Sequence, residues 1–284
     1  LWLFFITGII SYGFQFELER GQYNIIVVLL CLLAIYIFHF RQAFRIIAYI
    51  LFIIAVQLKI YPAIFIVMFI KDWANWKNNV KRILGLGLIN FAFLFILGYS
   101  VFIDFVKVIT LRSFIDSGSW VGNHSIKSFV SFLSQDAQSP LRGGTLTWVQ
   151  QHTSFLSLSL FIYFVICFLS IISIAYLRRE SGLNTYLLLA CTIGMMIIPS
   201  VSYDYKLAFL VGPMSITFGN LSMPTQLPKK ALSYFLVFIA SVAYSATLYP
   251  FKFRPDFIAN SAPLLFVILT ATTLLYLLQP HPLD

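Results

Sequence analysis

Four short polar clusters interrupt an apolar sequence, and they contain the side-chain types that bind anions and sugars. They are 17–24 (ELERGQYN), 59–62 (KIYP), 122–125 (GNHS) and 199–206 (PSVSYDYK). Cationic side chains bind phosphate through charge-assisted hydrogen bonds. Tyrosines around a carboxylate are typical of sugar sites, where the rings pack on a pyranose and the carboxylate accepts hydroxyl hydrogen bonds. The clusters therefore predict recognition of a phosphate and a sugar.

The first cations to consider are Lys59, Arg20 and Lys206. Lys59 lies inside an apolar stretch, where a lysine costs a few kcal/mol unless it is paired or reaches water. It either extends to the membrane interface or forms an anion site with Arg20 and Lys206. Arg20 has its own alternative, an ion pair with Glu17 or Glu19.

The last two clusters also allow two interpretations each. The 202–206 segment (SYDYK) is either a sugar-binding arrangement or an aromatic interfacial belt with a local Asp204–Lys206 pair. Asn123 begins a formal N-glycosylation sequon. His124 is either part of the site or a solvated loop residue.

Metal and covalent chemistry receive little support. The four histidines have no ligand spacing, and there is no Gly-rich phosphate loop, no GxSxG motif and no carboxylate pair at helical spacing within an apolar stretch. We expect neither a metal nor a cofactor.

The elements that must position these clusters are membrane helices. The 284 residues are 60% hydrophobic and only 10% charged, with a mean hydropathy of +0.89, whereas a soluble domain has roughly a quarter charged residues. The apolar blocks approach the roughly 20 residues of a membrane-crossing helix, and they lack the alternation of a membrane barrel. We predict one all-α domain over 1–284, a polytopic transmembrane helix bundle.

About eight spans are expected, with a break at 59–62 because proline cannot continue a helix. The spans are 23–38, 46–70, 83–99, 154–177, 183–198, 207–218, 231–249 and 262–278. Residues 1–12 are interpreted as the tail of a truncated helix. Residues 100–153 form one long connection with a short amphipathic helix at 126–133.

The charges are spread over the connections, so the net charge of +9 does not indicate nucleic-acid binding. Basic residues are densest in the short connections 39–45, 71–82, 178–182 and 219–230. Such connections stay in the cytoplasm, which places the four polar clusters and the 100–153 connection outside. Cys31, Cys167 and Cys191 lie in apolar blocks and are interpreted as buried hydrophobic residues.

The motifs ERGQYNIIVVLLCLLAIYIF, LKIYPAIFIVMFIKDW, GNHSI and PSVSYDYKL, in this order over about 17–207, resemble bacterial glycosyltransferase family 87. These are GT-C enzymes similar to mannosyltransferases. The resemblance implies an inverting transfer of mannose or another hexose from a polyprenyl-phosphate-sugar donor to a lipid or glycan acceptor. The transfer would occur at the outer face of a bacterial cytoplasmic membrane, among membrane lipids.

Motif by motif, the resemblance assigns the following residues to the cavity or the donor phosphate: Arg20, Gln22, Asn24, Lys59, Tyr61, Asn123, His124, Tyr203, Asp204 and Lys206. It places the catalytic base on an aspartate that would precede Leu1. Within this chain Asp204 is the best alternative, although Lys206 two residues away favours its ionised form and weakens it as a base. We therefore expect this segment to bind the donor but to transfer little sugar.

Three other functions fit the sequence less well. A polymerase or ligase of surface polysaccharide shares outer arginines and a long outer connection. A secondary transporter shares the broken helices and the intramembrane lysine. A structural membrane subunit has no need of the polar clusters.

Overall fold

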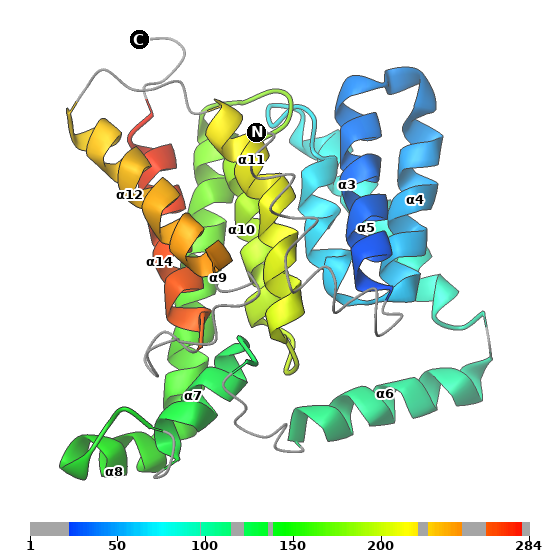
Figure 1. Cartoon of the computed structure of the whole chain (residues 1–284). Helices are drawn as coiled ribbons and strands as arrows, with labels where there is room; N and C mark the ends of the chain where they lie inside the picture. Colours follow the sequence, from blue (N-terminus) through cyan, green and yellow to red (C-terminus); the bar gives the residue numbers. More distant parts are fainter. Residues whose placement is uncertain are drawn as a thin grey trace.

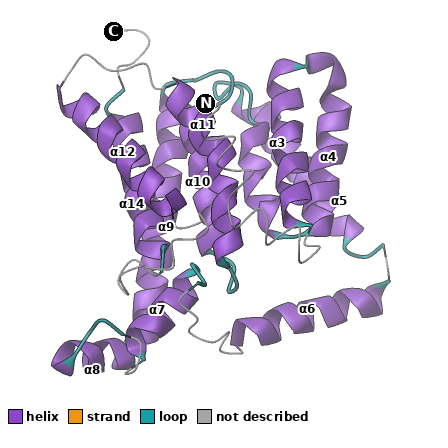
Figure 2. Cartoon of the chain, viewed as in Figure 1, coloured by secondary structure: helices purple, strands orange, loops and turns teal. Residues whose placement is uncertain are grey.

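The computed structural model describes residues 23–96, 98–114, 122–135, 139–220, 227–245 and 260–279. Within these ranges every regular element is a helix, apart from two isolated β-bridges (Figure 2). The predicted all-α class is therefore confirmed. Most helices run along one bundle axis, and α6, α7 and α8 gather at one end of the bundle (Figure 1).

The first group of helices forms an antiparallel layer that contains the predicted break. Its elements are α3 (Asn24–Phe40), η1 (Gln42–Phe44), α4 (Arg45–Leu58), η2 (Tyr61–Phe69) and α5 (Trp76–Phe93). Lys59 has extended backbone angles at the end of α4, and Pro62 lies in the first turn of η2. The break at 59–62 is confirmed.

The predicted long connection is itself helical. It contains α6 (Tyr99–Phe114), α7 (Ile126–Ser134) and α8 (Gly143–Gln151). The short helix predicted at 126–133 is confirmed as α7, and Ser125 caps it by accepting a hydrogen bond from the Ser128 N–H at 3.1 Å. Helix α6 lies across the bundle axis rather than along it (Figure 1).

The second group of helices completes the bundle. Its elements are α9 (Thr153–Leu177), α10 (Thr185–Ile197), η3 (Asp204–Leu210), α11 (Val211–Asn220), α12 (Leu227–Ser245) and α14 (Ala262–Leu277). Helices α5 and α12 begin earlier than the predicted 83 and 231. The cause is that lysine and arginine are good helix formers, so a helix continues into polar residues that hydropathy excludes.

Membrane crossing has one direct candidate among the described helices. Helix α9 is long and apolar enough to cross a bilayer, and only 17% of its most apolar window is buried. Five other apolar helices are shorter, at 10–17 residues. The eight predicted spans thus remain a prediction.

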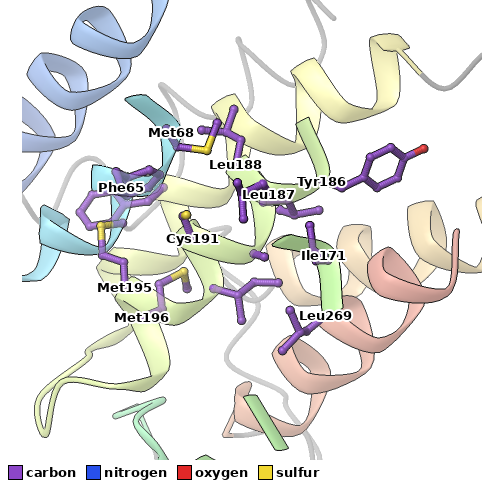
Figure 3. Close-up of a cluster of buried hydrophobic side chains, with 14 of the residues drawn as sticks. Phe65, Met68, Ile171, Tyr186, Leu187, Leu188, Cys191, Met195, Met196 and Leu269 are labelled. Carbon is purple, nitrogen blue, oxygen red and sulfur yellow. The ribbon is translucent and has the colours of Figure 1, made fainter. Parts of the chain in front are cut away.

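Helix α10 is the centre of the bundle, because all 13 of its residues are buried. A helix that is apolar on every side belongs in a core, and α10 packs against α9, α11, α14, η2 and η3. Figure 3 shows side chains of η2 (Phe65 and Met68), α9 (Ile171) and α14 (Leu269) around this helix.

The η2 segment is a 3₁₀ helix of nine residues, longer than the three or four that are usual. Side chains from three neighbouring helices hydrogen-bond to its carbonyl groups. His39 Nε2 lies 2.8 Å from the Met68 carbonyl, Arg82 donates to Phe69 at 2.9 Å, and the Cys191 thiol donates to Ile64 at 3.7 Å. The carbonyls of Met68 and Phe69 belong to the last turn of η2, where a helix has no N–H of its own to offer, so His39 and Arg82 supply the missing partners.

The closest approach to α10 is at Gly194. A Cβ atom there would lie 2.5 Å from both the Ile64 side chain and the Phe164 ring. A larger residue at this position would force the Ile64 side chain and the Phe164 ring to shift.

We expect Gly194→Ala to destabilise the protein by about 1–3 kcal/mol through overpacking. The matched control is Gly87→Ala in α5, where the nearest atom would be 3.9 Å away, and helix propensity should make this change neutral or stabilising by up to about 1 kcal/mol. Thermal unfolding in detergent measures both. Equal melting temperatures for the two variants would contradict the packing argument.

Candidate functional site

Described residues from all four polar clusters meet at the end of the bundle where α6, α7 and α8 lie, here called the His124 end. Asn24 begins α3, Tyr61 begins η2, and 122–125 precedes α7. The 198–203 connection and η3 follow α10. The sequence-distant motifs are thus adjacent in space.

A buried lysine joins two of these segments. Lys206 is only 5% exposed, and its ammonium lies 4.9 Å from the centre of the Tyr61 ring. The ammonium also donates to the Val201 carbonyl at 2.7 Å. The Tyr61 hydroxyl in turn donates to the Asn24 carboxamide at 2.8 Å. A cation, a phenol and an amide from three elements therefore converge in a low-dielectric environment, where electrostatic interactions are strong.

Asn123 holds the 200–202 segment in place. Its carboxamide donates to the Ser200 carbonyl at 3.0 Å and accepts from the backbone N–H groups of Ser202 at 2.7 Å and Ser125 at 3.3 Å. Its backbone pairs with Tyr203 in an isolated β-bridge. Asn123 is completely buried and its side chain is engaged on both ends, so the interpretation as a glycosylation sequon is wrong for this fold.

His124 is also completely buried, so the interpretation as a solvated loop residue is wrong. Its backbone N–H donates to the Ser202 carbonyl at 2.7 Å. Its Nδ1 atom accepts a hydrogen bond from the Ser261 N–H at 3.0 Å. Because a backbone N–H only donates, Nδ1 carries no proton and the ring N–H is on Nε2. His124 thus contributes a directed donor.

Asn260 and Ser261 belong to the same cluster and were not predicted. Asn260 donates to the Asn123 carbonyl at 2.9 Å and accepts from the Ala262 N–H at 2.9 Å. Both residues are buried immediately before α14. The available signal was an Asn-Ser-Ala-Pro sequence, which is typical of a helix start, but nothing in it indicates a partner 137 residues away.

Two hydroxyl groups beside His124 have unused hydrogen-bonding capacity. The Oγ atoms of Ser202 and Ser261 are buried and have no hydrogen-bond partner within the described structure. Buried polar groups are nearly always hydrogen-bonded. These hydroxyls are therefore suited to a polar group of a bound molecule.

The remaining predicted residues fall into two groups. Arg20 and Gln22 lie outside the described residues, as does the side chain of Asp204, whose backbone begins η3. Lys59 is half-buried, and no described side chain forms an ion pair or hydrogen bond with it. The structure thus brings together Asn24, Tyr61, Asn123, His124, Tyr203 and Lys206.

The helical bundle places a buried cation and the described polar residues of the four motifs together at one end. The sequence model of glycosyltransferase family 87 matches residues 1–200. The chain therefore belongs to glycosyltransferase family 87, as its motifs predict. No protein of curated function and no solved structure matches the chain. Lys206, Asn260 and Ser261 lie beyond the matched residues.

We expect Asn123→Ala to destabilise the fold by about 2–4 kcal/mol, because it removes three side-chain hydrogen bonds and leaves buried partners unpaired. Thermal unfolding in detergent measures the change. Thr147→Ala, on the exposed part of α8, is the control and should have little effect. A wild-type melting temperature for Asn123→Ala would show that the 200–202 segment is held by other contacts.

Proposed function

We propose that this chain transfers a hexose, mannose or a similar sugar, from a polyprenyl-phosphate-sugar to a lipid or glycan acceptor at the outer face of the cytoplasmic membrane. The observation that carries the proposal is the buried Lys206 ammonium over Tyr61, at the end where the family motifs meet. Family membership supports the transferase class. The donor and the sugar are what the resemblance to the family implies, and the membrane face is inferred from the charge distribution.

The proposed reaction is a single displacement with inversion. The acceptor hydroxyl oxygen attacks the anomeric carbon as the bond from that carbon to the phosphate oxygen breaks. The bonding electron pair leaves with polyprenyl phosphate, and the hydroxyl proton passes to a carboxylate. Lys206 would stabilise the charge that grows on the leaving phosphate, with Lys59 as a further cation near the same end. Arg20, which lies outside the described residues, is the third cation that the motifs assign to the phosphate.

The other residues would orient the sugar. The Ser202 hydroxyl, which has no hydrogen-bond partner within the described structure, would bind a sugar hydroxyl. Asn24, Tyr61 and His124 lie at the same end and would shape the space around the sugar. Asp204 at the start of η3 is the candidate base within this chain. Neither the displacement nor the proton transfer as proposed uses a metal or a cofactor.

The proposed membrane face follows from charge. Members of family 87 are membrane proteins, and α9 is apolar enough to cross a bilayer. The end opposite the His124 end contains the basic connections 39–45, 71–82 and 178–182. Because basic connections stay in the cytoplasm, the His124 end would face outward.

The orientation predicts a labelling pattern. A cysteine at Thr145, exposed on α8, should react with an impermeant thiol reagent in whole cells, whereas a cysteine at Asn75 should react only after cell lysis. The three native cysteines are buried and should remain unlabelled in both samples. The reverse pattern would place the His124 end in the cytoplasm and contradict the proposed face.

The role of Lys206 predicts a loss of transfer. We expect Lys206→Gln to lower kcat/KM for polyprenyl-phosphate-mannose by about 10²–10³-fold, comparable to the loss of a preorganised oxyanion donor. Tyr61→Phe keeps the ring and loses the hydroxyl, so its effect should be smaller. Lys107→Gln, which removes an exposed cation paired with Asp104, is the control.

The assay measures release of polyprenyl phosphate and formation of the glycosylated acceptor by the full-length protein in liposomes. Equal activity of Lys206→Gln and Lys107→Gln would contradict the proposed site. Consumption of a polyprenyl-diphosphate sugar instead would indicate a polymerase or ligase, and solute uptake without donor turnover would indicate a transporter.

A further inference from the structure

The end opposite the His124 end, here called the Arg178 end, contains a second ordered polar region. There the connection between α9 and α10 is joined to the connection between η2 and α5. The Trp73 N–H donates to the Glu180 carbonyl at 3.0 Å, and the Gly182 N–H donates to the Lys71 carbonyl at 2.8 Å. Asp72 and Ser181 form an isolated β-bridge. The two connections therefore form one surface.

The Arg178 end is strongly basic. Its described carboxylates are Asp72 and Glu180. Its described basic residues are Arg41, Arg45, Lys71, Lys77, Lys81, Arg82, Arg178, Arg179, Lys229 and Lys230. Such a surface favours anionic partners.

Two of the charged residues beside α9 are engaged within the protein. The Arg178 guanidinium donates to the last two carbonyls of α14, those of Tyr276 at 3.0 Å and Leu277 at 3.2 Å, and to the Gln279 carbonyl just beyond the helix at 2.7 Å. Glu180 accepts a hydrogen bond from Asn184 at 3.0 Å and lies 4.0 Å from Arg178. Arg178 therefore has a structural role at the end of α14.

Arg179 differs from both neighbours. Its guanidinium has no hydrogen bond or ion pair with any described residue. Its backbone φ is 50°, and no other described non-glycine residue has a positive φ. The Glu180 N–H donates to Ala175 and the Arg179 N–H donates to Tyr176, each at 3.1 Å. This is the Schellman pattern, in which glycine is the usual residue at the Arg179 position.

The Arg179 side chain lies between two hollows. One has a volume of about 520 Å³ and a mostly polar lining, which includes Glu180, Ser181 and Asn184 together with Leu183. The other, of about 420 Å³, is lined by Trp73, Ala74, Trp76, Tyr176, Leu177 and Arg179. A free cation thus stands where a polar hollow meets an aromatic one.

The aromatic hollow continues onto the exposed surface of α9. Tyr176 is 50% exposed and Leu177 is 75% exposed, at the end of the helix that is long enough to cross a bilayer. Tryptophan and tyrosine are enriched at the level of lipid headgroups. A phosphate at Arg179 would therefore have acyl chains directed along α9.

We propose that Arg179, with Trp73, Trp76 and Tyr176, forms a binding site for the phosphate of an anionic phospholipid in the leaflet at the Arg178 end. The guanidinium binds the phosphate oxygens through two parallel hydrogen bonds. The indole and phenol groups contact the glycerol region, and the chains pack on α9. Retention of positive charge in the cytoplasm requires no left-handed backbone, whereas an arginine at a left-handed position beside two hollows is accounted for by a ligand.

The test compares three variants of the full-length protein in neutral detergent supplemented with phosphatidylglycerol or phosphatidylcholine. Native mass spectrometry measures bound lipid, and thermal unfolding measures stabilisation. We expect Arg179→Gln to weaken phosphatidylglycerol binding by about tenfold, the value of one charge-assisted contact. The matched control, Lys230→Gln, removes the same charge from the same end and should change binding less than twofold.

Arg179→Gly separates binding from folding. Glycine adopts the left-handed backbone without steric strain, so this variant should melt at a higher temperature than the wild type in the absence of lipid. Addition of phosphatidylglycerol should raise its melting temperature only slightly. Donor binding at the His124 end should be unchanged in all variants. Equal losses in Arg179→Gln and Lys230→Gln, full binding by Arg179→Gln, or displacement of the lipid by millimolar inorganic phosphate would each overturn the proposal.

Discussion

The burial of α10 on every side is the constraint on which the rest of the structure depends. No face of this helix is available to lipid or water, so neighbouring elements cover it on every side. At the closest contact, the absence of a side chain at Gly194 leaves room for Ile64 of η2 and Phe164 of α9. The helix also connects the two polar ends. Asn184 caps its first turn beside Arg178 and Glu180, and the 200–202 segment follows its last turn at the His124 end. Both polar regions are therefore fixed to the same rigid element.

The polar residues of the family motifs divide between scaffold and site. In an apolar environment each connection between helices must satisfy its backbone groups with side chains. Asn123 binds the Ser200 carbonyl and the Ser202 N–H, while Lys206 binds the intervening Val201 carbonyl. The Asn123 carboxamide donates one hydrogen bond and accepts two within the scaffold. The buried ammonium, the aromatic ring beside it and the unpartnered serine hydroxyls are the groups with the chemistry to recognise one.

Much of this arrangement was predictable, because hydropathy and basic-residue density place polar connections on two sides of a bundle. That reasoning correctly grouped Asn24, Tyr61, His124 and Lys206 at one end, and Pro62 correctly marked the break after α4. Other features depend on tertiary contacts that no local pattern records. The nine-residue 3₁₀ helix is stabilised by side chains of three other helices. Asn260 resembles an ordinary helix start until its partner at Asn123 is seen.

The extent of the family match bears on how Lys206 is positioned. The match ends at residue 200, so it includes Asn123 and the carbonyl of Ser200 that Asn123 binds, but not Lys206. The lysine nevertheless follows directly on the segment that Asn123 and His124 hold. Asn123 binds the Ser200 carbonyl, His124 binds the Ser202 carbonyl, and the Lys206 ammonium donates to the Val201 carbonyl between them. Its location is therefore determined largely by residues inside the match. Asn260 and Ser261, outside the match, add a second support by joining the start of α14 to Asn123 and His124. A cation at this position needs the GNHS motif for its geometry, even though that motif is more than 80 residues away in the sequence.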